Sequence, residues 1–98
     1  MNISRITSIE LQKELQKTFD EFKKEMPKQK TWWLKQTYQV CEIGIDGCND
    51  QLEKINEHYY DGMEVEKLHE NERKNIILKS FWEKEKELIR EEIFKRAV

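Results

Sequence analysis

The sequence predicts an all-α fold: a three-helix antiparallel bundle, or a helical hairpin with an added helix, that contains a long central helix. Apolar residues between positions 31 and 59 alternate at intervals of four and three, the 3.5-residue repeat of a helix that packs against other helices. One proline and three glycines in 98 residues are too few for the turns of a multi-stranded protein. The chain is 37% hydrophobic and 39% charged, which predicts one domain with a thin core.

The first predicted helix spans residues 8–25. Thr7 and Glu10 have the spacing of a capping box, in which each side chain bonds the backbone N–H of the other residue. Pro27 ends the helix because a proline disfavours the helical conformation of the residue before it. Spacings of three and four place the apolar residues on one face: Leu11, Leu15, Phe19, Phe22 and Met26.

The second predicted helix spans residues 31–60, with Thr31 as its N-cap. Its packing stripe consists of Leu34, Tyr38, Cys41, Ile45, Cys48, Leu52, Ile55 and Tyr59. Gly44 and Gly47 each cost a helix interior about 1 kcal/mol relative to alanine, and Asp46-Gly47 is also typical of a β-hairpin turn. Residues 48–55 lack strand alternation, so we expect a continuous helix with a bend or bulge at the glycines.

The third predicted helix spans residues 70–96. Its broad apolar face comprises Leu78, Phe81, Trp82, Leu88, Ile89 and Ile93. Residues 63–74 are highly charged and contain few apolar side chains, so they are expected to form a loop or a frayed extension of this helix.

The second helix carries apolar residues on a second face, opposite the packing stripe. These residues are Trp32, Trp33, Val40 and Ile43, with Gly47 among them. One expectation is that the first helix covers this back face, which would make the second helix the centre of a flat arrangement. The other is that the face binds a protein partner or another copy of the chain, since tryptophan is a preferred interface anchor and glycine permits close backbone approach.

The net charge of −2 conceals three blocks of charge. Residues 1–35 and 73–98 each carry eight basic and five acidic side chains, whereas residues 36–72 carry two basic and ten acidic. An antiparallel hairpin would therefore have one acidic and one basic end. The basic end suggests an alternative site for an anion or a nucleotide near a helix N-terminus, and its residues would be Lys28, Lys30, Lys35, Trp32 and Trp33. The acidic end could instead mimic nucleic acid.

The sequence contains no recognisable catalytic constellation, and we expect no enzyme activity, metal or cofactor. Cys41 and Cys48 are about 10.5 Å apart along a helix, too far for a disulfide, and are expected to be reduced core thiols. His58 and His69 with two separated cysteines do not form a zinc motif. The start of the chain lacks a signal-peptide pattern and no long apolar run follows, so we expect a cytoplasmic protein that does not enter membranes.

These observations favour a small protein-binding module, an inhibitor, adaptor or assembly factor of the kind that phages and mobile elements also encode. Its partner would be another protein or a second copy of the chain. The rival hypothesis is an anion-binding or nucleotide-sequestering protein. The pI near 5.8 argues against general nucleic-acid binding.

Overall fold

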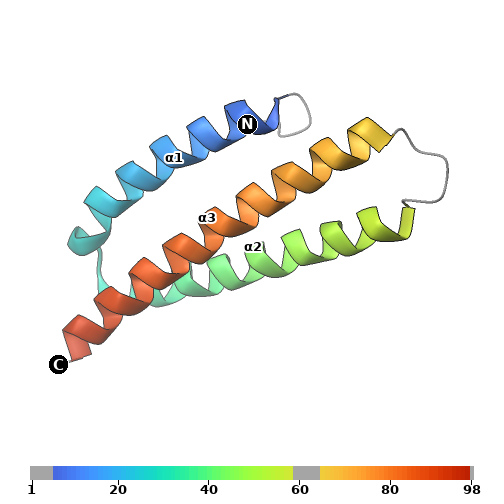
Figure 1. Ribbon diagram of the computed structural model, residues 1–98. Helices are drawn as coiled ribbons and strands as arrows, with labels where there is room; N and C mark the ends of the chain where they lie inside the picture. The colour runs from blue at the N-terminus through green and yellow to red at the C-terminus, as the bar shows by residue number, and fades with distance from the viewer. Residues whose placement is uncertain (1–5, 59–64, 98) are drawn as a thin grey trace.

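The structure is a computed structural model that describes residues 6–58 and 65–97. It contains the helices α1 (Ser8–Glu25), α2 (Thr31–His58) and α3 (Val65–Ala97), with a short 3-10 helix, η2 (Met26–Lys28), between the first two (Figure 1). The described residues form no strand, and the all-α prediction is confirmed. The predicted end of the second helix near residue 60, and Tyr59 in its stripe, lie outside the described residues.

Helix α1 begins with the capping box that the sequence predicts. The Thr7 hydroxyl accepts a hydrogen bond from the Glu10 N–H at 3.2 Å, and the Glu10 carboxylate accepts one from the Thr7 N–H at 3.4 Å. At the other end the chain tightens into η2, which contains Pro27, and Met26 is buried there. The capping box at one end and Pro27 at the other thus limit the length of α1 through interactions local to the sequence.

Helix α2 continues through Gly44 and Gly47, so the prediction of one continuous helix is confirmed, and no π-helical bulge interrupts residues 31–58. The Lys30 carbonyl accepts the first helical hydrogen bond, from the Leu34 N–H at 3.1 Å, so Thr31 lies within the first turn. The Thr31 hydroxyl accepts a hydrogen bond from Arg96 instead of serving as an N-cap. The described part of the packing stripe faces the core, with Leu34, Cys41, Cys48 and Ile55 buried.

Helix α3 begins at Val65, five residues before the predicted start, so of the two alternatives for residues 63–74 the extension of the helix is confirmed over 65–74 and the loop is wrong there. Tertiary contacts explain the difference. Leu68 is buried, and Glu70 accepts hydrogen bonds from the backbone N–H and the hydroxyl of Ser8. Lys74 is also buried. These contacts stabilise a helical segment that has few apolar residues of its own.

The third helix, not the second, packs along both of the others. Helix α2 runs antiparallel to α3, as Gly44 against Trp82 and Thr31 against Arg96 show. Helix α1 runs parallel to α3, with Ser8 bonded to Glu70 and Phe19 packed on Phe81. Figure 1 shows α3 between α1 and α2. The expectation that the first helix covers the back face of the second is therefore wrong.

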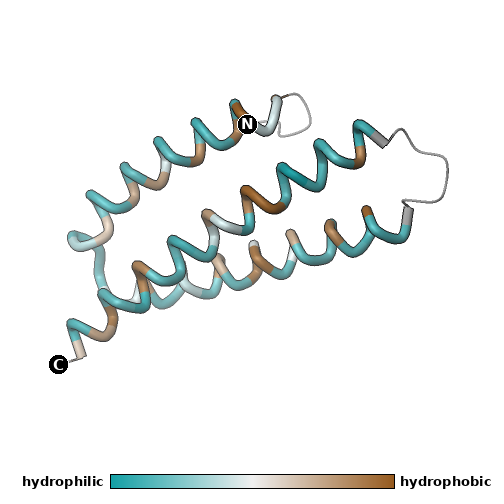
Figure 2. Tube along the Cα trace, viewed as in Figure 1, coloured by the Kyte–Doolittle hydropathy of each residue, from teal (hydrophilic) through white to brown (hydrophobic). Residues whose placement is uncertain are grey.

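Packing against α3 explains this arrangement, because α3 presents apolar side chains toward both neighbours. Phe81 meets Phe19 of α1 with ring centroids 6.1 Å apart, whereas Trp82 lies against α2 at Gly44. The molecule is elongated and flat, with extents of 54 × 23 × 16 Å. Figure 2 shows hydrophobic segments recurring along each helix among hydrophilic ones, as expected for a thin core. Helix α2 consequently lies at one edge of the molecule.

Candidate protein-binding face

The candidate site is the outer face of α2, defined by Trp32, Gln36, Val40, Ile43 and Gly47. Intervals of four, four, three and four place these residues on one side of the helix, opposite the packing stripe. Trp32 is 58% exposed, Val40 51% and Ile43 70%. Since α1 packs along α3, no described helix covers this face. The face thus holds three large apolar side chains on less than half of one helix.

Trp33 does not belong to this face, although the sequence groups it with Trp32. Adjacent residues on a helix point about 100° apart. Trp33 is half-buried against the core and tilts toward Phe22 of α1, with ring centroids 6.4 Å apart. The predicted partner-binding set therefore divides into an outer group, Trp32, Val40, Ile43 and Gly47, and a tryptophan that joins α1 to α2.

The two glycines of α2 have different surroundings. At Gly44 an added Cβ would lie 2.6 Å from Nε1 and 2.7 Å from Cδ2 of the Trp82 ring, distances that real Cβ atoms do not adopt. At Gly47 an added Cβ would have no atom within 4 Å. Gly44 thus permits the close approach of α3, whereas the fold of one chain does not require a glycine at position 47.

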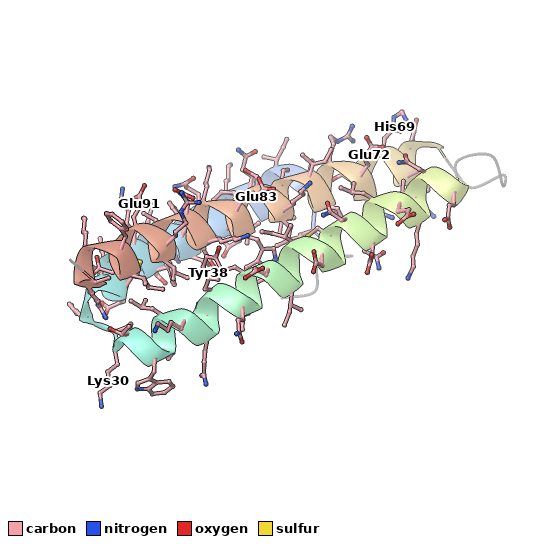
Figure 3. All side chains as sticks on the ribbon, turned by 90° about the horizontal axis from the view of Figure 1, so that it is seen from below. Lys30, Tyr38, His69, Glu72, Glu83 and Glu91 are labelled. Atoms are coloured by element: carbon pink, nitrogen blue, oxygen red, sulfur yellow. The ribbon has the colours of Figure 1, made fainter. Side chains whose placement is uncertain are left out.

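The predicted anion-binding residues are also divided by the structure. Lys28 forms an ion pair with Glu25 at 3.6 Å, on the exposed surface. Lys30 projects from the end of the α2–α3 pair opposite His69 and Glu72 (Figure 3). Trp33 contacts the core, so only Trp32 offers an exposed indole near these lysines. Binding of an anion here remains a prediction.

Arg96 joins the C-terminal end of α3 to the corner between α1 and α2. Its guanidinium donates hydrogen bonds to the Pro27 carbonyl at 3.0 Å and the Thr31 hydroxyl at 3.2 Å, and it pairs with Glu92 at 3.1 Å. The Arg96 side chain therefore binds three acceptors, which belong to η2, α2 and α3. Arg96 thereby holds the start of α2, and with it Trp32, against the rest of the molecule.

A thiol and a carboxylate meet inside the bundle, a contact that the sequence does not predict. The Cys41 Sγ donates to Glu85 Oε2 at 3.9 Å. Burial, with the nearby Glu85 carboxylate, raises the pKa of Cys41 from 9.0 to about 12, and burial also raises the pKa of Glu85. The high thiol pKa disfavours the thiolate, so this pair does not form an activated nucleophile. Helical periodicity does place Glu85 beside Phe81 and Trp82, the one sequence signal for its burial.

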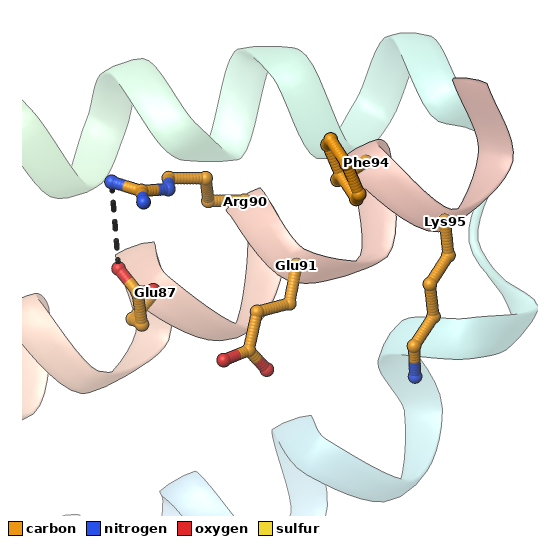
Figure 4. A pocket seen from close by; sticks show the side chains of 5 residues that line it. All are labelled: Glu87, Arg90, Glu91, Phe94 and Lys95. Carbon is orange, nitrogen blue, oxygen red and sulfur yellow. Dashed lines mark ion pairs between the residues drawn. The ribbon is translucent and has the colours of Figure 1, made fainter. Parts of the chain in front are cut away.

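A shallow hollow of about 410 Å³ lies on α3 near its C-terminal end (Figure 4). All five lining side chains come from α3 and are exposed: Glu87, Arg90, Glu91, Phe94 and Lys95. Glu87 and Arg90 form an ion pair at 3.9 Å. Ligand pockets enclose the ligand, whereas this hollow lies on the open surface of a single helix, and four of its five lining side chains are charged.

Among residues 6–58 and 65–97 there is no group of three or more metal-ligating side chains. None of the helices formed by these residues is long and apolar enough to cross a membrane. Comparison of the chain with protein-family models, curated proteins and solved structures finds no match in any of the three.

Proposed function

We propose that this chain is a non-enzymatic protein-binding module and that the outer face of α2 is its binding surface. The observation that carries this proposal is the exposure of Trp32, Val40 and Ile43 on one side of one helix. Small proteins seldom leave such a row of large apolar side chains in water without a binding role. An exposed helix face with anchors about one and two turns apart also suits helix-mediated recognition.

The chemistry of the face fits a protein partner better than a small ligand. Tryptophan is among the residues most enriched in interface hot spots, and aliphatic neighbours supply apolar area. The face is convex and has no enclosing walls, since all its residues come from α2. A surface of this shape binds another surface, such as a helix or a groove of a second protein.

The test is capture of partners from the native host on the immobilised chain, compared with two variants. Ile43→Glu places a charge on the outer face, and Ile76→Glu places the same charge on α3, where Ile76 is 51% exposed. We expect the immobilised wild type and the Ile76→Glu variant to capture proteins, including the chain itself. The Ile43→Glu variant should not capture them. Equal retention by both variants, with both folded by circular dichroism, would contradict the proposal.

A further inference from the structure

We propose that the outer face of α2 binds a second copy of this chain, with the two α2 helices antiparallel. This inference rests on the proposed function, because it names the partner of the same face. Three observations carry it: the spacing of the apolar residues, the open surroundings of Gly47 and the distribution of charge along α2.

The spacing of the outer face suits a helix–helix contact. Val40, Ile43 and Gly47 follow one another at intervals of three and four, the spacing of residues at a helix seam. A pair with Val40 of each copy opposite Ile43 of the other is symmetric about a twofold axis, so one patch supplies both sides. Gln36 of each copy is then level with Gly47 of the other.

The open surroundings of Gly47 allow the backbone of a second chain to approach α2 closely. A glycine inside a helix costs about 0.5–1 kcal/mol relative to alanine, and the fold of a single chain has no steric need for one at this position. In the antiparallel pair Gly47 lies about one helical turn beyond Ile43, where a missing side chain lets the second backbone come near. Gly44, about 60° around α2 from Gly47, plays the same role toward Trp82 of α3.

Charge along α2 selects the antiparallel direction. Between residues 31 and 41 the one charged side chain is Lys35. From residue 42 to residue 57 the helix carries one basic residue, Lys54, and five acidic ones: Glu42, Asp46, Asp50, Glu53 and Glu57. Antiparallel pairing sets the basic half of each copy against the acidic half of the other, whereas parallel pairing sets like charges together.

The register of the antiparallel pair places Lys35 of one copy beside two aspartates of the other. Lys35 lies five residues before Val40, so it is level with position 48 of the second copy, between Asp46 and Asp50 and about 3 Å along the axis from each. All three side chains project from the same flank of the outer face. In a twofold antiparallel pair, this flank of one copy meets the same flank of the other. The contact between Lys35 and the two aspartates therefore occurs twice.

The first test measures molecular mass in solution by sedimentation equilibrium over a range of concentrations. We expect the wild type and Ile76→Glu to reach twice the chain mass of 12.0 kDa as concentration rises, and Ile43→Glu to remain at the mass of one chain. A wild type that stays monomeric at high micromolar concentration would overturn the proposal. So would an Ile43→Glu variant that is folded and dimerises like the wild type.

The second test reverses the charges that set the direction. Lys35→Glu alone, and Asp46→Lys with Asp50→Lys, are each expected to weaken the dimer about tenfold, since both put like charges together. The variant that combines all three substitutions should recover wild-type affinity, because the contacts of residue 35 with residues 46 and 50 are then restored with the signs exchanged. A triple variant as weak as the others would overturn the antiparallel pairing.

Failure of self-association and failure of the protein-binding function are distinguishable. If the chain is monomeric but a protein from the host binds it and is lost with Ile43→Glu, the partner proposed here is wrong and the function of the face stands. If the chain is monomeric and the Ile43→Glu variant captures the same proteins as the wild type, both proposals are wrong.

Discussion

Trp82 of α3 packs its indole directly over Gly44 of α2, in space that any other side chain at position 44 would need. An added Cβ would lie 2.6 Å from the indole Nε1. This pair sets how closely the two longest helices approach. It also separates the roles of two glycines that are three residues apart and equivalent by sequence.

Gly44→Ala is expected to lower the free energy of unfolding by about 1–3 kcal/mol, because the new methyl group forces the Trp82 ring away from its packed position. The alanine itself favours helix, so the steric cost must exceed that gain. Urea unfolding followed by circular dichroism measures the difference. Gly47→Ala is the matched control, and at dilute protein it should raise the free energy of unfolding by about 0.5–1 kcal/mol. Stabilisation by both substitutions would contradict the packing of Trp82 on Gly44.

Arg96→Ala is expected to lower the free energy of unfolding by about 1–2 kcal/mol. The substitution removes hydrogen bonds to Pro27 and Thr31 and leaves the half-buried Glu92 without its cation. Arg90→Ala serves as the control, because its pair with Glu87 is long and exposed and should contribute at most about 0.5 kcal/mol. Both values come from the same urea titration, and equal effects would argue against a special role for Arg96.

The Glu85 carboxyl gives the stability of the protein a defined pH dependence. Burial raises its pKa above the ordinary value of 4.5 in the folded state, so the folded state holds the proton more tightly than the unfolded state. The free energy of unfolding should therefore fall as the pH rises from 4.5 through the folded-state pKa. Glu85→Gln should remove this slope and be more stable than the wild type at pH 7. Thermal unfolding of the wild type and of Glu85→Gln at pH 5 and pH 7 checks the prediction. The same change in stability with pH in both proteins would contradict it.

Cys41 is expected to react slowly with thiol reagents while the protein is folded. The rise of its pKa from 9.0 to about 12 lowers the thiolate fraction about a thousandfold, and burial adds a steric barrier. Labelling at pH 8, followed by mass spectrometry of peptides, should show protection that disappears in urea. A Cys41 that labels equally fast with and without urea would show that the thiol is accessible.

Much of the fold follows from local sequence. The capping box of Thr7 and Glu10 and the stop at Pro27 give α1 its limits, and a sustained 3.5-residue stripe identifies α2 despite two internal glycines. These signals act between residues a few positions apart, through hydrogen bonds and steric limits that do not depend on the rest of the chain. The apolar faces of all three helices are readable for the same reason.

Tertiary structure alone decided which helix lies between the other two and which faces stay exposed. Periodicity shows that a face is apolar but not what covers it, since that depends on contacts such as Phe19 with Phe81 across 62 positions of sequence. The same long-range packing extended α3 back to Val65 and placed Glu85 against Cys41. It also turned Trp33 inward and left Trp32 outside, because two neighbouring residues on a helix meet different surroundings once the partner helix has a fixed side.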